Sequence, residues 1–146
     1  MNRIEIANQY HKKGYNCCQS VLGAFADRLE IPEEAAMCLG AGFGSGAGTG
    51  ELCGAITGAV MALDLIAGGD AVSDPAGAKR RAAGRSRELQ KRFSERFGAL
   101  RCRELLKNEK EEPSDAVRAL GIADHCGVMI ASAVEIAEEL LQEEGF

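Results

Sequence analysis

The chain has 146 residues, enough for one compact domain that buries roughly two thirds of its unfolded surface without needing disulfides. It contains no Trp, five Phe, two Tyr and three Pro, a composition that favours closely packed helices over strands. The formal net charge of -5 argues against a general nucleic-acid binder.

The first forty residues predict three short helices. Asn2 and Glu5 have the spacing of a capping box at the start of the first helix. Asn16 is a second N-cap candidate, and apolar residues recur with helical spacing over residues 18–29, so the second helix is expected to end before Pro32. A third helix is expected to start after this proline.

The segment 40–50, GAGFGSGAGTG, has the glycine content of a phosphate-binding loop but not its pattern. No Gly-Lys-Ser/Thr follows it, as in a Walker A loop, and no strand precedes it, as in a dinucleotide site. We interpret it as a tight loop that brings the backbone close to whatever Cys53 binds, because glycine permits positive φ and close approach.

The segment 50–69 is apolar on nearly every side and predicts the central helix of the protein. Its apolar run, residues 52–67, contains Asp64 and is shorter than the roughly 20 apolar residues that a bilayer span requires. The first residues of the chain lack a basic segment followed by an apolar run. We therefore expect a cytoplasmic protein without membrane insertion.

Three glycines recur at every fourth position of this central helix. Gly50, Gly54 and Gly58 would leave a bare groove that another backbone or a bulky ligand can approach. Thr49 is the expected N-cap, which would place Cys53 in the first turn, where the helix dipole favours a thiolate.

The second half predicts a long basic helix, two short elements and a final helix. The long helix follows Pro75 and ends at Gly98; a short helical turn is expected near Val117, and Asp124 is the expected cap of the last helix. Opposite charges on the basic segment 79–107 and the acidic C-terminal turn predict two solvated helix faces that attract one another. With no internal repeat or long linker, residues 1–146 are expected to form a single all-α bundle of about six helices.

Six cysteines are unusual in a chain expected to be cytoplasmic, where structural disulfides are rare. Cys17, Cys53 and Cys126 fall in predicted first turns, and Cys102 follows the break at Gly98 between two arginines, Arg101 and Arg103, that could lower its pKa. Cys18 and Cys38 are expected to be small buried hydrophobic residues. The sequence has neither a C-x-x-C motif nor a zinc-finger pairing of Cys with His.

The cysteine segments resemble the C_GCAxxG_C_C family of redox-active proteins, which are small and helical. The resemblance is carried by the following segments: Gly14-Tyr15-Asn16-Cys17, the glycine loop leading to Gly50-Glu51-Leu52-Cys53, the motif Cys53-Gly54-Ala55-Ile56-Thr57-Gly58, Cys102-Arg103-Glu104-Leu105-Leu106, and Cys126. The four cysteines of the family map onto Cys17, Cys53, Cys102 and Cys126. Cys18 and Cys38 have no counterpart among them.

The resemblance implies a redox role without a settled reaction. It also implies a link to a membrane transporter, because genes of this family often lie near transporter genes. A similar helical region occurs in the split-Soret cytochromes, where a cysteine-bound iron–sulfur centre has been considered. No C-x-x-C-H haem attachment motif is present, so no haem is expected.

Three functions remain open at this point. The first is an iron–sulfur cluster held by Cys17, Cys53, Cys102 and Cys126 for electron transfer to an unknown redox partner, with Gly50, Gly54 and Gly58 making room for it. The second is a metal-free thiol–disulfide protein that uses two of the four cysteines. The third is a non-catalytic adaptor with a structural zinc site, a cofactor ranked below the cluster.

The sequence does not fix the roles of the two histidines and Asp64, the presence of an enzymatic activity or the oligomeric state. His125 is either solvated or a ligand or proton partner of Cys126, whereas His11 carries no signal. Asp64, which should share a helix face with Cys53, is a proton relay, a buried carboxylate or a packing contact. No Ser/His/Asp arrangement can be placed, so the sequence leaves open whether the protein is an enzyme. A homodimer is also compatible with the Gly-rich surface.

Overall fold

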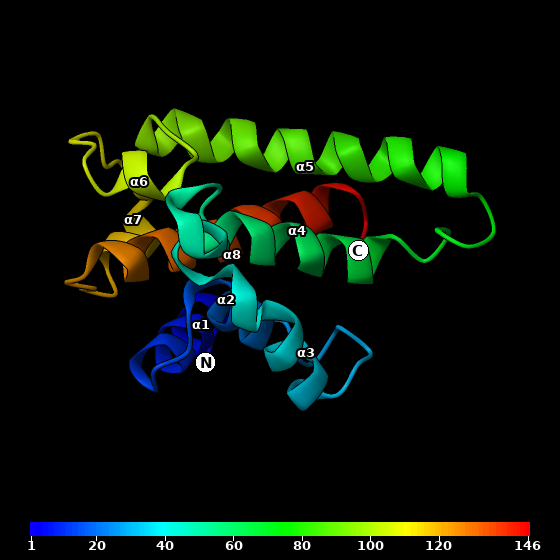
Figure 1. Ribbon diagram of the computed structural model, residues 1–146, viewed down its shortest axis with the longest axis horizontal. Helices are drawn as coiled ribbons and strands as arrows, with labels where there is room; N and C mark the ends of the chain where they lie inside the picture. The colour runs from blue at the N-terminus through cyan, green and yellow to red at the C-terminus, as the bar shows by residue number, and fades with distance from the viewer.

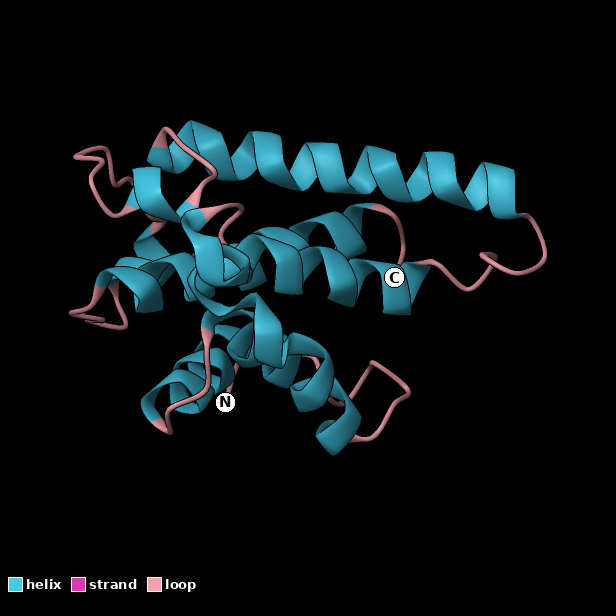
Figure 2. Cartoon of the chain, viewed as in Figure 1, coloured by secondary structure: helices cyan, strands magenta, loops and turns pink.

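The computed structural model describes all residues, 1–146, as helices joined by loops and turns (Figure 2). The eight α-helices are α1 (Arg3–Lys12), α2 (Cys17–Ala24), α3 (Glu33–Gly40), α4 (Gly54–Ala67), α5 (Pro75–Phe97), α6 (Cys102–Leu105), α7 (Asp115–Arg118) and α8 (His125–Glu143). A 3₁₀ turn, η1 (Ala41–Phe43), and a π turn, η2 (Gly46–Gly50), lie between α3 and α4. The expected all-α class is confirmed, with six helices of eight or more residues and two of four residues.

The helices are arranged in three levels in the view of Figure 1. The long helix α5 lies along one side, α4 and α8 run beneath it, and α1, α2 and α3 lie on the opposite side. Helix α4 packs against α2, α8 and α5, and α1 packs against α2 and α8. The expectation that the segment 50–69 supplies a central helix is therefore confirmed.

The core consists of apolar side chains contributed by all the long helices. Phe25, Ile56, Leu63, Phe93 and Ile130 are fully buried, and burying each such side chain stabilises the fold by about 1.5–3 kcal/mol. Helix α4 has only 14 residues, and none of the helices combines the length and the apolar character that crossing a bilayer requires.

Side-chain caps start α1, α2 and α8 where the sequence predicts them. The Asn2 side chain accepts a hydrogen bond from the Glu5 N–H, and the Glu5 carboxylate accepts one from the Asn2 N–H. Asn16 forms the same reciprocal capping box with Gln19, and the Asp124 carboxylate accepts from the Gly127 N–H. Each cap satisfies backbone donors that the first helical turn leaves unpaired.

Two expected boundaries are wrong. Helix α2 ends at Ala24, and Phe25 and Leu29 enter the core from the turns that follow it. Helix α4 begins at Gly54, so Cys53 occupies the N-cap position and Thr49 does not cap the helix. The reason is that Thr49 belongs to η2, whose backbone has positive φ at neighbouring residues and turns away from the α4 axis.

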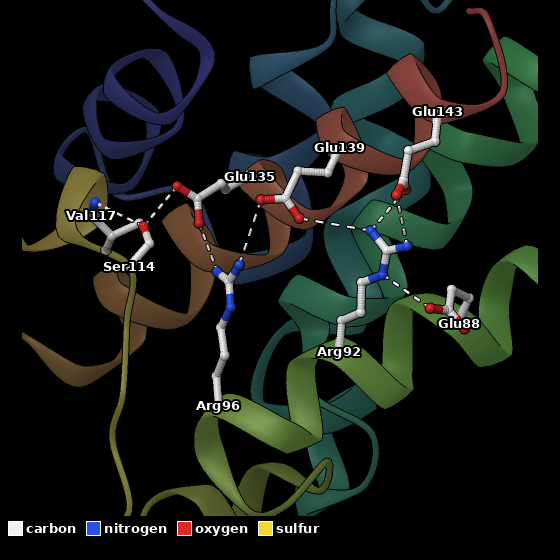
Figure 3. A network of polar contacts seen from close by, with 8 residues as sticks. All are labelled: Glu88, Arg92, Arg96, Ser114, Val117, Glu135, Glu139 and Glu143. Atoms are coloured by element: carbon white, nitrogen blue, oxygen red, sulfur yellow. Dashed lines mark hydrogen bonds and ion pairs between the residues drawn. The ribbon is translucent and has the colours of Figure 1, made fainter.

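Ion pairs join α5 to α8, as the charge pattern predicts (Figure 3). Arg92 Nη1 lies 2.8 Å from Glu143 Oε2 of α8, and within α5 the Arg92 Nε atom lies 3.0 Å from Glu88 Oε1. One turn further along α5, Arg96 Nη1 lies 2.6 Å from Glu135 Oε1. The Arg96–Glu135 pair is the better shielded from solvent, with side chains 22% and 17% exposed, so it should contribute more to stability than the outer pairs.

Candidate functional site

All four cysteines of the predicted site line one cavity of about 100 Å³. It is the hollow between the starts of α2, α4, α6 and α8, and its wall is mostly apolar. The lining residues are Cys17, Ser45, Gly46, Cys53, Gly54, Cys102, Leu105, Leu106, His125, Cys126 and Met129. The fold thus gathers sulfurs from four separate segments, as the cysteine hypothesis requires.

Each cysteine lies at or next to the start of a helix. Cys17 is the first residue of α2, Cys102 is the first residue of α6, and Cys126 is the second residue of α8. Cys53 immediately precedes α4. The first N–H groups of a helix have no partner within the helix, and the helix dipole is positive at that end, so positive helix ends point toward the cavity.

Backbone hydrogen bonds hold the segments of Cys53 and Cys102 side by side. The Cys53 N–H donates to the Leu100 carbonyl at 2.9 Å, and the Cys102 N–H donates to the Glu51 carbonyl at 2.7 Å. Leu52 and Arg101 form an isolated antiparallel bridge between them. This pairing places two cysteines that are distant in sequence on the same wall of the cavity.

Two glycines allow the backbone to fold tightly around the cavity. Gly46 has φ of +62°, and a Cβ atom there would lie 2.9 Å from the Cys102 Cβ atom. A Cβ atom on Gly54 would lie 2.5 Å from the Phe43 carbonyl oxygen and 3.3 Å from the Cys17 Cβ atom. A side chain at either position would therefore push a cysteine segment away from the site.

The other glycines of the expected groove lie outside the cavity lining. Gly50 precedes α4, has φ of +73° and is covered by the Arg103 side chain. A Cβ atom on Gly58 would lie 2.8 Å from the Cys18 carbonyl oxygen, so this glycine lets the backbone of α2 approach α4. Of the three glycines, only Gly54 borders the cavity.

The electrostatic environment separates Cys126 from the other thiols. Coupling to the Cys17 thiol lowers the pKa of Cys126 to about 6, and His125 and His11 add to this effect. The same coupling, together with burial, raises the pKa of Cys17. The two thiols therefore titrate as a pair, and ionisation of one disfavours ionisation of the other.

Burial dominates at the two remaining cysteines. It raises the pKa of Cys53 to about 11, although the backbone amides of Ala55 and Ile56 oppose the shift. Burial and the nearby Cys126 also raise the pKa of Cys102. The expected lowering by Arg101 and Arg103 is wrong, because both guanidinium groups bind Glu51 instead.

One residue of the site was missed by the sequence. His11, on α1, contacts Asp124 through Nε2 at 2.7 Å and is among the groups that lower the pKa of Cys126. Its Nδ1 atom is buried and has no hydrogen-bond partner. A lone histidine in a short amphipathic helix gives no signal, because only the packing of α1 against α8 brings it here.

Three other assignments have mixed outcomes. Cys18 is fully buried, as predicted. Cys38 is exposed, so its assignment to the core is wrong; α3 buries only Ala36 and Gly40 against its neighbours. Asp64 does not reach the cysteine cavity but lines a separate hollow with Arg85 near the other end of α4.

The four cysteines surround the cavity without converging on one point. No three His, Cys, Asp or Glu side chains are placed to hold a single metal ion together. The thiolates nevertheless interact: the charges of Cys126, Cys53 and Cys102 all contribute to raising the pKa of Cys17. The cavity therefore brings four thiol groups together without a preformed site for a single metal ion.

Comparison with known proteins identifies one family. The family described as "Putative redox-active protein (C_GCAxxG_C_C)" matches residues 15–140, which includes all four cysteines of the cavity. No curated protein and no solved structure matches the chain.

Proposed function

Since the chain belongs to the C_GCAxxG_C_C family of redox-active proteins, we propose that Cys17, Cys53, Cys102 and Cys126 hold an iron–sulfur cluster for electron transfer. The observation that carries this proposal is the gathering of four cysteines, from four separate segments, around one cavity. Four cysteine thiolates are the usual ligand set of such clusters.

The number of cysteines supports a cluster over a simple disulfide switch. A disulfide needs two sulfurs, whereas four thiolates in one small cavity repel one another and raise the pKa values of their neighbours. A bound cationic centre would relieve this repulsion, because it stabilises the deprotonated form of each ligand.

A closed zinc site is the less supported metal centre. It needs four sulfurs about 2.3 Å from one point, and no side chains are grouped to hold a single ion. The proposal of a cluster rests on the family and on the cavity that the four cysteines share.

The residues around the cysteines suit this role. Gly46 and Gly54 let the backbone come close to the sulfurs, and Leu105 and Met129 supply an apolar wall that limits water. Gly50 and Gly58 would act indirectly, by permitting the turn before α4 and the close packing of α2. A bound cluster supplies one-electron transfer, and Leu106, 62% exposed beside the cavity, marks the side where a redox partner would dock.

A set of cysteine variants tests the proposal. The protein is purified anaerobically, reconstituted with iron and sulfide, and analysed for both elements and for visible absorption. We expect wild type to bind a cluster and Cys→Ser variants at positions 17, 53, 102 and 126 each to lose most of it. Cys38→Ser is the exposed control and Cys18→Ala the buried control, and both should retain the cluster. A colourless, iron-free wild type after reconstitution would contradict the proposal.

A second candidate function is metal-free thiol–disulfide exchange. It is favoured by the interaction of Cys17 with Cys126, which gives one thiolate at neutral pH beside a protonated partner thiol. If this candidate is right, oxidation of the metal-free protein should yield a Cys17–Cys126 disulfide detectable by peptide mapping, and Cys53→Ser should leave its formation intact. Both candidates suit a reducing compartment such as the cytoplasm, where thiols stay free.

A further inference from the structure

A second site lies on the face that α5 turns toward α8. Arg85, Arg92 and Arg96 follow one another with helical spacing on this face. Arg92 and Arg96 each make close ion pairs with carboxylates of α8 (Figure 3), at 2.8 Å from Glu143 and 2.6 Å from Glu135. Arg85 differs from both.

Arg85 is a buried cation without a hydrogen bond. Its side chain is only 9% exposed, its Nε atom is buried without a partner, and its nearest acidic oxygen, Glu144 Oε2, lies 3.9 Å from Nη1. That separation exceeds hydrogen-bond length. Removing a guanidinium from water costs several kcal/mol unless hydrogen bonds or a counter-ion offset it.

Open space is available next to this guanidinium. Arg85 borders a hollow of about 610 Å³, with Leu140 and Phe146 as apolar parts of its wall. It also borders a smaller hollow of about 280 Å³ that contains Asp64. Neither hollow shares a lining residue with the cysteine cavity. From Cys53 to Asp64 alone, α4 extends about 16 Å at about 1.5 Å per residue.

The surrounding charges restrict what can bind there. Asp70 and Glu88 are already engaged, by Arg81 and Arg92 respectively. Glu144 forms only a long ion pair with Arg85, at 3.9 Å, and Asp64 interacts with the same guanidinium through its charge. Neither makes a hydrogen bond to Arg85, and both carboxylates would repel a multiply charged anion such as phosphate more strongly than a singly charged one. A singly charged, planar group matches the two Nη atoms of one guanidinium.

We propose that the Arg85 hollow binds a small monocarboxylate, whose carboxylate pairs with the Arg85 guanidinium and whose apolar part lies against Leu140 and Phe146. This ligand site is separate from the cysteine site and does not depend on the function proposed there. A binding role explains why this buried guanidinium has no hydrogen bond, whereas Arg92 and Arg96 of the same stripe are hydrogen-bonded to carboxylates.

Titration of the full-length protein with propionate, at constant ionic strength, tests the proposal. Binding is followed by NMR through backbone amides of α5 and α8 and through the Arg85 Nε–H resonance. We expect saturable shifts confined to this hollow, and at least tenfold weaker binding in Arg85→Met. Arg87→Met, which removes an exposed cation from the same helix, should bind propionate like wild type.

Further arms of the experiment separate the alternatives. Arg85→Lys keeps the charge but lacks the planar fork, so it should bind several-fold more weakly than wild type; it also supplies the test if Arg85→Met does not fold. Phosphate should bind more weakly than propionate. The proposal is overturned if wild type shows no saturable shift, or if phosphate binds as well as propionate. It is also overturned if Arg85→Met binds propionate like wild type, or if Arg87→Met loses binding as much as Arg85→Met does. If Arg85→Met does not fold, Arg85→Lys takes its place in these comparisons.

Discussion

His11 Nε2 lies 2.7 Å from Asp124 Oδ2, so the first helix is fastened to the N-cap of the last one. The same carboxylate accepts a hydrogen bond from the Gly127 N–H at 2.9 Å. Cys126 lies between Asp124 and Gly127 in the chain. Helix α1, Arg3–Lys12, lies entirely before the segment 15–140 that matches the family. A residue outside the matched segment therefore contacts the start of α8 beside the cysteine cavity.

Substitution of His11 should raise the pKa of Cys126. In His11→Gln the positive contribution is lost, so the thiolate is less stabilised, and we expect a rise of up to about one unit from the value of about 6. His125→Gln should raise this pKa somewhat more, and Cys17→Ala should raise it most, because the interaction with Cys17 is the largest cause of the shift. The pH dependence of alkylation at Cys126, resolved by peptide mass spectrometry, measures each value. Lys12→Gln, an exposed change on α1, is the control, and a reversed rank order would disprove this account of the pair.

The reduced, metal-free protein should lose stability at alkaline pH. The pKa of Cys53 is raised from 9 to about 11, so the unfolded chain releases this proton first, and the stability present below pH 9 is lost as pH rises to 11. Two units correspond to about 2–3 kcal/mol, and the raised pKa of Cys17 acts in the same direction. Cys126 has the opposite sign: its lowered pKa adds stability above pH 9 that is lost as pH falls through about 6.

Anaerobic urea unfolding with reductant and chelator checks this prediction. The free energy of unfolding should pass through a maximum near pH 9, where the two opposite contributions meet. In Cys53→Ala the decrease between pH 9 and 11 should be smaller than in wild type. Equal decreases in the two proteins would show that Cys53 is not its source.

Two glycines in helices should respond to alanine with opposite signs. A Cβ atom at position 58 would lie 2.8 Å from the Cys18 carbonyl oxygen, so Gly58→Ala forces α2 and α4 apart and should cost about 1–3 kcal/mol. Gly84 lies inside α5 with open space at its Cβ position, so Gly84→Ala should add about 0.5–1 kcal/mol by favouring the helix. Thermal unfolding of the two variants beside wild type measures both effects. If Gly58→Ala left the stability unchanged, α2 and α4 would be able to shift apart without cost.

Local signals predicted the helices well because they depend on neighbours in the chain. Asn2, Asn16 and Asp124 cap where expected, since a cap needs only a polar side chain and the next turn of backbone. The gathering of four cysteines was expected from their positions near helix starts and from the family resemblance. The contacts that side chains make between those helices could not be predicted from the same local signals.

Two errors of prediction involve contacts with other elements of the fold, and a third involves the turn just before α4. Arg101 and Arg103 bind Glu51, which no local rule connects with them, so their charges do not lower the pKa of Cys102. Cys38 is exposed because only part of α3 is covered by its neighbours, a property of packing rather than of helical period. The start of α4 at Gly54 depends on the π turn, whose geometry joins several positive-φ residues.

The positions of Cys17 and Cys126 also constrain when the cavity can exist in a growing chain. At a synthesis rate of about 5–20 residues per second, the ribosome makes the second of them on the order of 5 to 20 s after the first. Throughout that interval the early thiols have no enclosed site to occupy and remain open to oxidants and stray metal ions. The complete site can therefore assemble only after α8 has been synthesised.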